Sequence, residues 1–147
     1  MKTPLYRRFT ISVFSFLTLA IMSTLFLACS QKFVFSISPV EPAAEGSVKV
    51  KQDKNDNYKI DLNVIRLAEP GRLSPPKNVY IVWMTTNENG TTNIGQLKSS
   101  SSLLSSALKS SLNTVSSVKP KDFFITAEDN AAVQSPNGLV VLKTNAF

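Results

Sequence analysis

The stretch "NVYIVWMTTNENGTTNIGQL", residues 78–97, decides the fold class of this chain. Between residues 79 and 84 every side chain is apolar or aromatic, so both faces of a strand built from this segment would be apolar. Such a pattern is typical of a central strand that is covered on both sides. Asn89-Gly90 follows and is a strong hairpin signal, because both residues tolerate positive φ. The sequence therefore predicts a β-hairpin in which residues 91–98 form the returning strand.

Segments on both sides of this hairpin alternate apolar and polar residues with period 2. The alternation is clearest in "SVKVKQ" (47–52) and "YKIDLNVIRL" (58–67), which are separated by the turn-rich "DKNDN" (53–57). This alternation predicts half-buried strands joined as a second hairpin. Further strands are predicted at "DFFITAED" (122–129) and, after the turn "SPNG", at "LVVLKT" (139–144).

The serine-rich segment 98–118 is ambiguous. Leu104, Leu108, Leu112 and Val115 fit one stripe of a helix, but alternate residues also fit a strand. Ser and Thr compete for the hydrogen bonds of a helical backbone. We therefore expect a loop followed by a strand, and a short helix remains the alternative.

Six or seven short strands without a βαβ rhythm predict an all-β, antiparallel β-sandwich. Cys29 is the single cysteine, so no disulfide can connect the two sheets and the fold must depend on its apolar core. The residues expected to supply that core are Leu62, Val64, Val79, Ile81, Trp83, Phe123, Ile125, Val140 and Leu142.

The N-terminus has the layout of a secretory signal. The positively charged "MKTPLYRR" precedes an uncharged apolar run that ends at Ala28, immediately before Cys29. The segment "FLAC" resembles the lipobox of bacterial lipoproteins, in which the cysteine thiol receives a diacylglyceryl group and the signal peptide is cut just before it. The resemblance implies that Cys29 is the lipidation site. Phe26 departs from the pattern, which most often has Leu there.

The expected organisation is a cleaved lipoprotein signal peptide at 1–28, a lipidated tether at 29–45 and a β-sandwich domain at 46–147. Alternatives are an uncleaved signal anchor, since 19 residues at about 1.5 Å each could span a membrane, and an ordinary signal peptide followed by an unrelated cysteine. All three place the domain outside the cytoplasm. Within the expected tether, "KFVFSIS" (32–38) alternates enough to form a first strand instead.

The strand region from Gly46 to Thr144 resembles the extracytoplasmic domain of anti-sigma-K factors. The positions that carry the likeness are Tyr80, Trp83, Gly90, Gly95, Glu128, Pro136, Gly138 and the stretch 139–142. The resemblance implies an immunoglobulin-like β-sandwich. It does not imply sigma-factor binding, because that activity belongs to a cytoplasmic helical region and this chain has eight residues before its apolar run.

The charge balance and the lack of His in the amino-acid composition reduce the number of functions to be considered. The chain has 16 Lys and Arg against 10 Asp and Glu, and without the three basic residues of the N-terminus the excess is small. Because no block of Lys and Arg with interleaved aromatics exists, we expect no nucleic-acid partner. There is no His, so the commonest general base and a frequent metal ligand are missing.

No motif predicts a catalytic, cofactor-binding or metal site. Asp53, Asn55 and Asn57 begin like a calcium loop, but Tyr58 stands where that loop needs Gly, so a hairpin turn is the better interpretation. We expect Trp83 to be a core residue and not a platform for a ligand.

The expected function is that of a non-catalytic envelope lipoprotein, held on the membrane by the lipid on Cys29 and binding a protein, glycan or other envelope component. The alternatives are an anti-sigma-like sensor acting with a separate chain, and a hydrolase that uses Ser, Lys, Asp or Glu without His.

Overall fold

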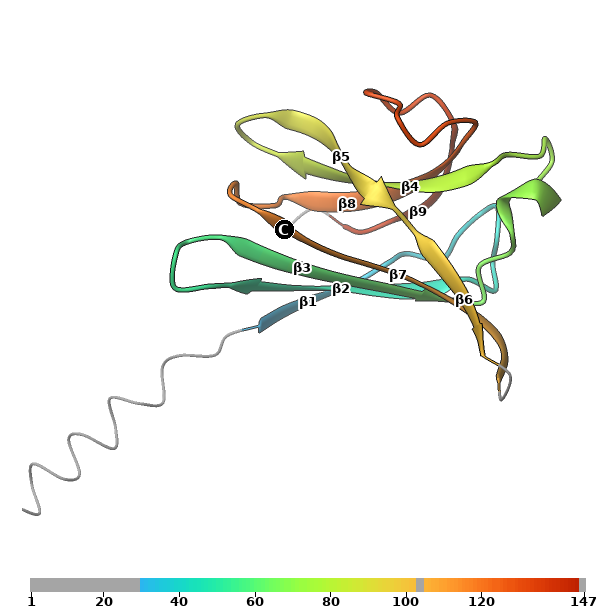
Figure 1. Cartoon of the computed structure of the whole chain (residues 1–147), viewed down its shortest axis with the longest axis horizontal. Helices are drawn as coiled ribbons and strands as arrows, with labels where there is room; N and C mark the ends of the chain where they lie inside the picture. The colour runs from blue at the N-terminus through green and yellow to red at the C-terminus, as the bar shows by residue number, and fades with distance from the viewer. Residues whose placement is uncertain (1–29, 103–104, 146–147) are drawn as a thin grey trace, which may run out of the picture.

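The computed structural model describes residues 30–102 and 105–145, and it is an all-β sandwich of two antiparallel sheets (Figure 1). The first sheet has five strands in the order β1-β2-β3-β7-β6. Their bounds are Ser30–Val34 for β1, Glu45–Gln52 for β2, Tyr58–Ile65 for β3, Ser105–Ser116 for β7 and Lys98–Ser102 for β6.

The second sheet has four strands in the order β5-β4-β8-β9. Their bounds are Gly90–Gln96 for β5, Val79–Thr86 for β4, Asp122–Glu128 for β8 and Leu139–Lys143 for β9. The chain crosses between the sheets three times, through residues 66–78, through Leu97 and through 117–121. The first crossing contains the short 3₁₀ helix η2 (Pro70–Arg72).

Both predicted hairpins are confirmed. β4 pairs with β5 across the Asn89-Gly90 turn, where Gly90 has a φ of 66°. β2 pairs with β3 across residues 53–57. Asp53 closes that turn, since its Oδ1 accepts hydrogen bonds from the backbone N–H groups of Asn55 at 2.8 Å and Asn57 at 3.1 Å. The pKa of Asp53 lies below its usual range, and the hydrogen bond from the Asn55 N–H is the largest cause.

The core between the sheets forms where the alternation of β2, β3 and β8 places it. Val48, Ile60 and Leu62 come from the five-stranded sheet, and Val82 and Ile125 come from the other. On β4 the expected core face was wrong: the inter-sheet core takes Tyr80, Val82 and Met84, while Ile81 and Trp83 are buried on the outer face. Of the nine expected core residues, seven are buried. Val79 is half-buried, and Val140 was wrongly placed in the core because it is 44% exposed.

A bulge explains the error at Val140. The β8–β9 register shifts between Ile125 and Thr126, so that Leu142 stays opposite Ile125 while Val140 lies opposite Thr126. The residue between them, Val141, is fully buried. A bulge inserts one residue into a strand and reorients its neighbours, which the period-2 pattern does not reveal.

The expected tether is also corrected. Ser30–Val34 forms β1, which pairs with β2 along its whole length. Phe35 is buried and bridges to Thr144, and the Ser36 N–H donates to the Lys143 carbonyl oxygen at 2.9 Å. Residues 30–45 therefore belong to the sandwich, in agreement with the alternative of a first strand.

Segment 98–118 is a strand hairpin and not a helix. The expected strand is present as β7, whereas Lys98–Ser102, which we expected to be loop, forms the edge strand β6. β6 follows β5 after Leu97 alone, so one nearly continuous extended segment contributes to both sheets (Figure 1). Residues 103–104 lie outside the described part of the chain.

Candidate functional site

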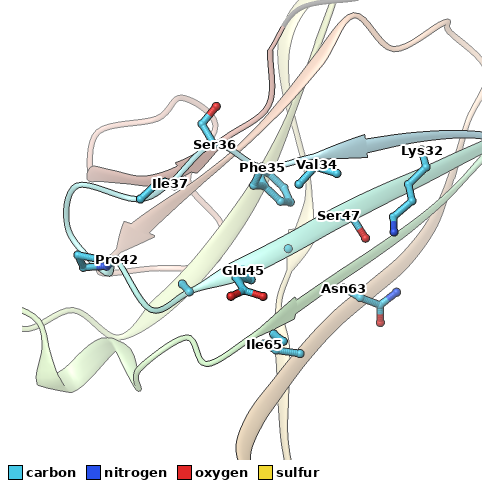
Figure 2. A pocket seen from close by; sticks show the side chains of 12 residues that line it. Lys32, Val34, Phe35, Ser36, Ile37, Pro42, Glu45, Ser47, Asn63 and Ile65 are labelled. Atoms are coloured by element: carbon cyan, nitrogen blue, oxygen red, sulfur yellow. The ribbon is translucent and has the colours of Figure 1, made fainter.

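A groove of about 550 Å³ lies on the outer face of the five-stranded sheet, where β1 ends and β2 begins. In Figure 2, Val34 and Ile37 form one side, Asn63 and Ile65 on β3 form the other, and Ser47 lies on β2 between them. The side chains of Val34 and Ile37 are open to solvent, with residue exposures of 65% and 85%. Exposed aliphatic side chains beside a groove are a typical feature of a contact surface.

Gly46 is one of the residues that line this groove. A Cβ atom at Gly46 would lie 2.8 Å from Cδ2 of Phe35 and 3.0 Å from the carbonyl oxygen of Asn63. Only glycine fits so close to the neighbouring strand without displacing it. Gly46 shares its face of β2 with the buried Val48 and Val50, so the glycine permits close packing against Phe35 and β3 on the core side.

Two of the polar side chains that line the groove have partners in the structure. Glu45 forms an ion pair with Arg66 at the rim. The Asn63 side chain donates to Asp61 Oδ1 at 2.8 Å. Lys32 is the groove's cationic side chain. The groove can therefore hold an extended apolar segment through Val34 and Ile37 and an anionic group through Lys32.

A second arrangement of polar groups lies on the outer face of the four-stranded sheet. Trp83 is fully buried, but it lies outside the cluster between the sheets, in which its neighbours Val82 and Met84 take part. Its Nε1–H donates to Thr126 Oγ1 at 2.7 Å, and the Thr126 hydroxyl donates to Glu128 Oε1 at 2.7 Å. The expected burial of Trp83 is confirmed, although it points away from the inter-sheet core.

The loop 129–138 is attached to this face from above (Figure 1). Glu128 Oε1 accepts hydrogen bonds from the backbone N–H groups of Asn137 and Gly138, at 3.2 and 2.9 Å. On β5, Asn93 donates through its side chain to the carbonyl oxygens of Ala131 and Val133. Since Asn93 is opposite Trp83 in the β4–β5 ladder, these contacts hold the loop over the indole.

Gly138 allows the loop to return to the sheet. A Cβ atom there would lie 1.9 Å from the carbonyl oxygen of Ala127, a distance that no side chain can occupy. The Pro-Gly turn noted in the sequence is thus a close approach of two backbones.

Tyr80 lies on the inner face of β4. It is buried, and its hydroxyl group has no hydrogen-bond partner within the described residues. Burial, with a smaller contribution from Glu41, raises the pKa of Tyr80 to about 12.

The remaining positions of the anti-sigma-K pattern lie in β5, at the end of β8 and before β9. They are Gly90 and Gly95 in β5, Glu128 at the end of β8, and Pro136 and Gly138 before β9.

Cys29, the predicted lipidation site, lies outside the described residues, and the described chain begins at the next residue. In the part of the chain that the structure covers, no group of three His, Cys, Asp or Glu side chains is placed to bind a metal ion. Nor does that part contain a helix long and apolar enough to cross a membrane.

One cluster of charged residues was not predicted from the sequence. Lys32, Lys49, Lys51 and Lys59 come from three strands and meet on the outer face of the five-stranded sheet. In the sequence they are spread over residues 32–59, so they do not appear as a basic block. The available signal was the alternation of lysine with valine in 48–51, which places these lysines on one face.

Comparison with known proteins gave no match to any protein family, to any curated protein or to any solved structure.

Proposed function

We propose that this protein is a lipid-anchored lipoprotein of the bacterial cell envelope, whose sandwich has a non-catalytic binding role. The observation that carries the proposal is the "FLAC" segment ending an uncharged apolar run at the single cysteine. If Cys29 is acylated, β1 begins at the residue that follows the lipid, with no spacer between them. The domain would lie directly on the membrane surface.

We also propose that the sandwich is of the immunoglobulin type. The order β2-β3-β7-β6 agrees with A-B-E-D of that fold, and β4, β8 and β9 agree with C, F and G, with β5 beside C. β1 is then an additional edge strand. One departure is the tryptophan of the C-like strand, because Trp83 faces outward and not into the inter-sheet core.

The groove beside β1 supports a binding role. Its exposed aliphatic side chains, Val34 and Ile37, and its lysine suit an extended segment of an envelope protein or glycan. Its carboxylate, on Glu45, is already engaged by Arg66, so the groove offers contacts for binding and no pair of free titratable groups for acid–base chemistry.

The anchor is tested by mass spectrometry of protein extracted from bacterial membranes. We expect an N-terminal peptide that begins at Cys29 and carries a diacylglyceryl group. Cys29→Ala should block the modification and leave an unprocessed precursor, while Ser30→Ala serves as the control and should be processed normally. An intact Met1 terminus, or an unmodified Cys29 thiol, in the unaltered protein would refute the proposal.

The binding role is tested at the groove by in-cell crosslinking. Ile37→Asp should abolish the crosslinked product without changing the melting temperature, because Ile37 is exposed. Val140→Asp, an exposed aliphatic position on β9, is the matched control. Equal crosslinking by both variants would contradict a role for the groove.

A further inference from the structure

The outer face of the five-stranded sheet carries an ordered group of lysines. In the β1–β2 ladder Lys32 is directly opposite Lys49, and in the β2–β3 ladder Lys51 is directly opposite Lys59. All four are exposed. Because alternate residues of a strand share a face, the four ammonium groups lie on one surface, which we call the lysine face.

This arrangement is electrostatically unfavourable for the isolated fold. Directly opposed residues have Cβ atoms about 5 Å apart, and like charges at such positions are destabilising. Neither of the ion pairs found in the described chain, Arg66–Glu45 and Lys77–Asp129, includes one of these lysines. Two carboxylates lie near these lysines: Asp61, which is opposite Lys49 and accepts a hydrogen bond from Asn63, and Asp53, which interacts with Lys59. The lysine face therefore keeps an excess of positive charge that an external anion would neutralise.

Two exposed aliphatic residues lie on the same surface. Val34 is opposite Ser47, one row beyond Lys32 and Lys49. Val115 is opposite Lys59 and is 58% exposed. Lysines combined with exposed aliphatic side chains are typical of protein surfaces that lie at a membrane interface, where headgroups attract the charges and the acyl boundary accepts the apolar groups.

The position of the lysine face identifies the anion. Ser30, the residue after Cys29, is directly opposite Lys51. An anchor on Cys29 would thus hold Lys32 and Lys51 within a few residues of the bilayer, inside the roughly 8–10 Å over which a charged surface acts at physiological salt. The named residues of the face include no aromatic side chain on which the bases of a nucleic acid could stack.

We propose that the lysine face binds the anionic phospholipid headgroups of the membrane to which the chain is attached. The location of the membrane beside β1 rests on the proposed lipid anchor. The attraction itself depends only on the four lysines.

The test is lysine footprinting of the full-length protein on vesicles. Protein is added to vesicles of phosphatidylcholine alone, or with about one third phosphatidylglycerol, and exposed lysines are acetylated with a water-soluble reagent and quantified by mass spectrometry. On the anionic vesicles, labelling of Lys32, Lys49, Lys51 and Lys59 should fall about fivefold, the factor equivalent to about 1 kcal/mol of attraction per lysine. Lys143, exposed on the other sheet, should label equally on both, and 1 M salt should remove the protection because the screening length falls to about 3 Å.

Two variants of equal net charge provide the control. Lys49→Gln/Lys51→Gln should lose the protection of the two remaining lysines, whereas Arg72→Gln/Lys143→Gln, whose changes lie away from the lysine face, should retain it. Equal labelling of the four lysines on neutral and anionic vesicles would overturn the proposal. So would protection by an added acidic polysaccharide in place of anionic vesicles.

The same samples separate this inference from the proposed function, because the N-terminal peptide is read in the same spectra. Acylated Cys29 with unprotected lysines refutes the lysine face and leaves the lipoprotein proposal intact. Unmodified Cys29 with lysines protected only on anionic vesicles supports the lysine face and refutes the lipid anchor.

Discussion

Thr126 joins the indole of Trp83 to the carboxylate of Glu128. Its hydroxyl accepts from the Trp83 indole and donates to the Glu128 carboxylate, each at 2.7 Å, and all three residues are almost completely buried. A buried polar group that loses its partner keeps its desolvation cost, which is larger than the net value of the hydrogen bond. At the scale of single residues, loss of this hydroxyl would therefore leave the Trp83 N–H buried without its partner.

We predict that Thr126→Val, which keeps the shape and removes the hydroxyl, lowers the free energy of unfolding by about 1–3 kcal/mol, since it leaves the buried Trp83 N–H without its partner. Glu128 keeps its hydrogen bonds from the Asn137 and Gly138 N–H groups. Thr126→Ser keeps the hydroxyl and should lose clearly less. Chemical denaturation followed by the fluorescence of Trp83, the single tryptophan, measures both. Similar losses for Val and Ser would show that the hydroxyl has no special role.

Tyr80 shows a different consequence of burial at the residue scale. The pKa of its phenol is raised to about 12 in the folded protein, first because of burial, against about 10 in an unfolded chain. Above pH 10 the unfolded chain releases this proton while the folded chain still holds it, so the stabilising contribution present below pH 10 is lost as the pH rises to 12.

We predict that the free energy of unfolding falls by roughly 2–3 kcal/mol between pH 10 and 12 on account of this group. Tyr80→Phe should remove that part of the pH dependence and cost little at pH 7, because the hydroxyl has no partner among the described residues. Denaturant titrations of both proteins at pH 7, 10 and 12 test this. An unchanged pH profile in Tyr80→Phe would contradict it.

At the scale of elements, the β2–β3 hairpin contains a pair of like charges that lowers its stability. Lys51 and Lys59 are directly opposed, and opposite charges at such a pair are favourable where like charges are not. If the lysines serve binding, their removal should stabilise the fold while weakening its attraction to anionic lipid.

We predict that Lys51→Glu raises the free energy of unfolding by about 0.2–1 kcal/mol, by changing a repulsive pair into an attractive one. Lys143→Glu makes the same change in net charge at a position opposite Phe124 and should have a smaller effect. The two variants are compared by thermal unfolding at low salt, where a lower melting temperature for Lys51→Glu would argue against repulsion in this ladder.

The loop 129–138 is the second element with a clear weak point. Gly138 lies against the Ala127 carbonyl oxygen, whereas Gly71 in η2 has open space where a Cβ would be. We predict that Gly138→Ala costs more than about 2 kcal/mol through displacement of the loop, as in other overpacked sites, while Gly71→Ala is close to neutral. Red-shifted Trp83 fluorescence in Gly138→Ala would report uncovering of the indole, and equal stability of the two variants would contradict the close approach.

At the scale of the whole molecule, β1 and the segment after it complete the sandwich. Phe35 and Ala44 belong to the buried cluster, and residues 35 and 36 contact the end of β9 in the other sheet. The segment 30–45 therefore connects the two sheets at one edge.

We predict that a chain beginning at Ser30 folds and is predominantly β by circular dichroism. A chain beginning at Gly46 should lose at least about 3–5 kcal/mol, the typical cost of removing a buried aromatic residue such as Phe35. Of a total stability of about 5–15 kcal/mol, this loss threatens folding. Equal melting temperatures for the two chains would restore the interpretation of 30–45 as a tether.

The sequence by itself determined the fold class and most of the core. Alternation in β2 and β3, the two apolar faces of β4 and the Asn89-Gly90 turn are local signals, because side-chain direction along a strand follows residue parity and a tight turn follows the φ that its residues tolerate. Each can be read without knowledge of which strands become neighbours. The lipobox-like "FLAC" is equally local, and it remains a prediction.

Only the tertiary structure decided which residues from distant segments share a surface. The bulge between β8 and β9 buries Val141 in place of Val140. The segment expected to be a tether contains the edge strand β1. The lysine face combines residues of β1, β2 and β3. Register, bulges and strand order depend on packing between segments far apart in the chain. Shifting a strand by two residues leaves the same side chains on each face, so the period-2 alternation cannot distinguish such registers. For that reason the core could be predicted in β2, β3 and β8, whereas the inward face of β4, the groove and the lysine face could not.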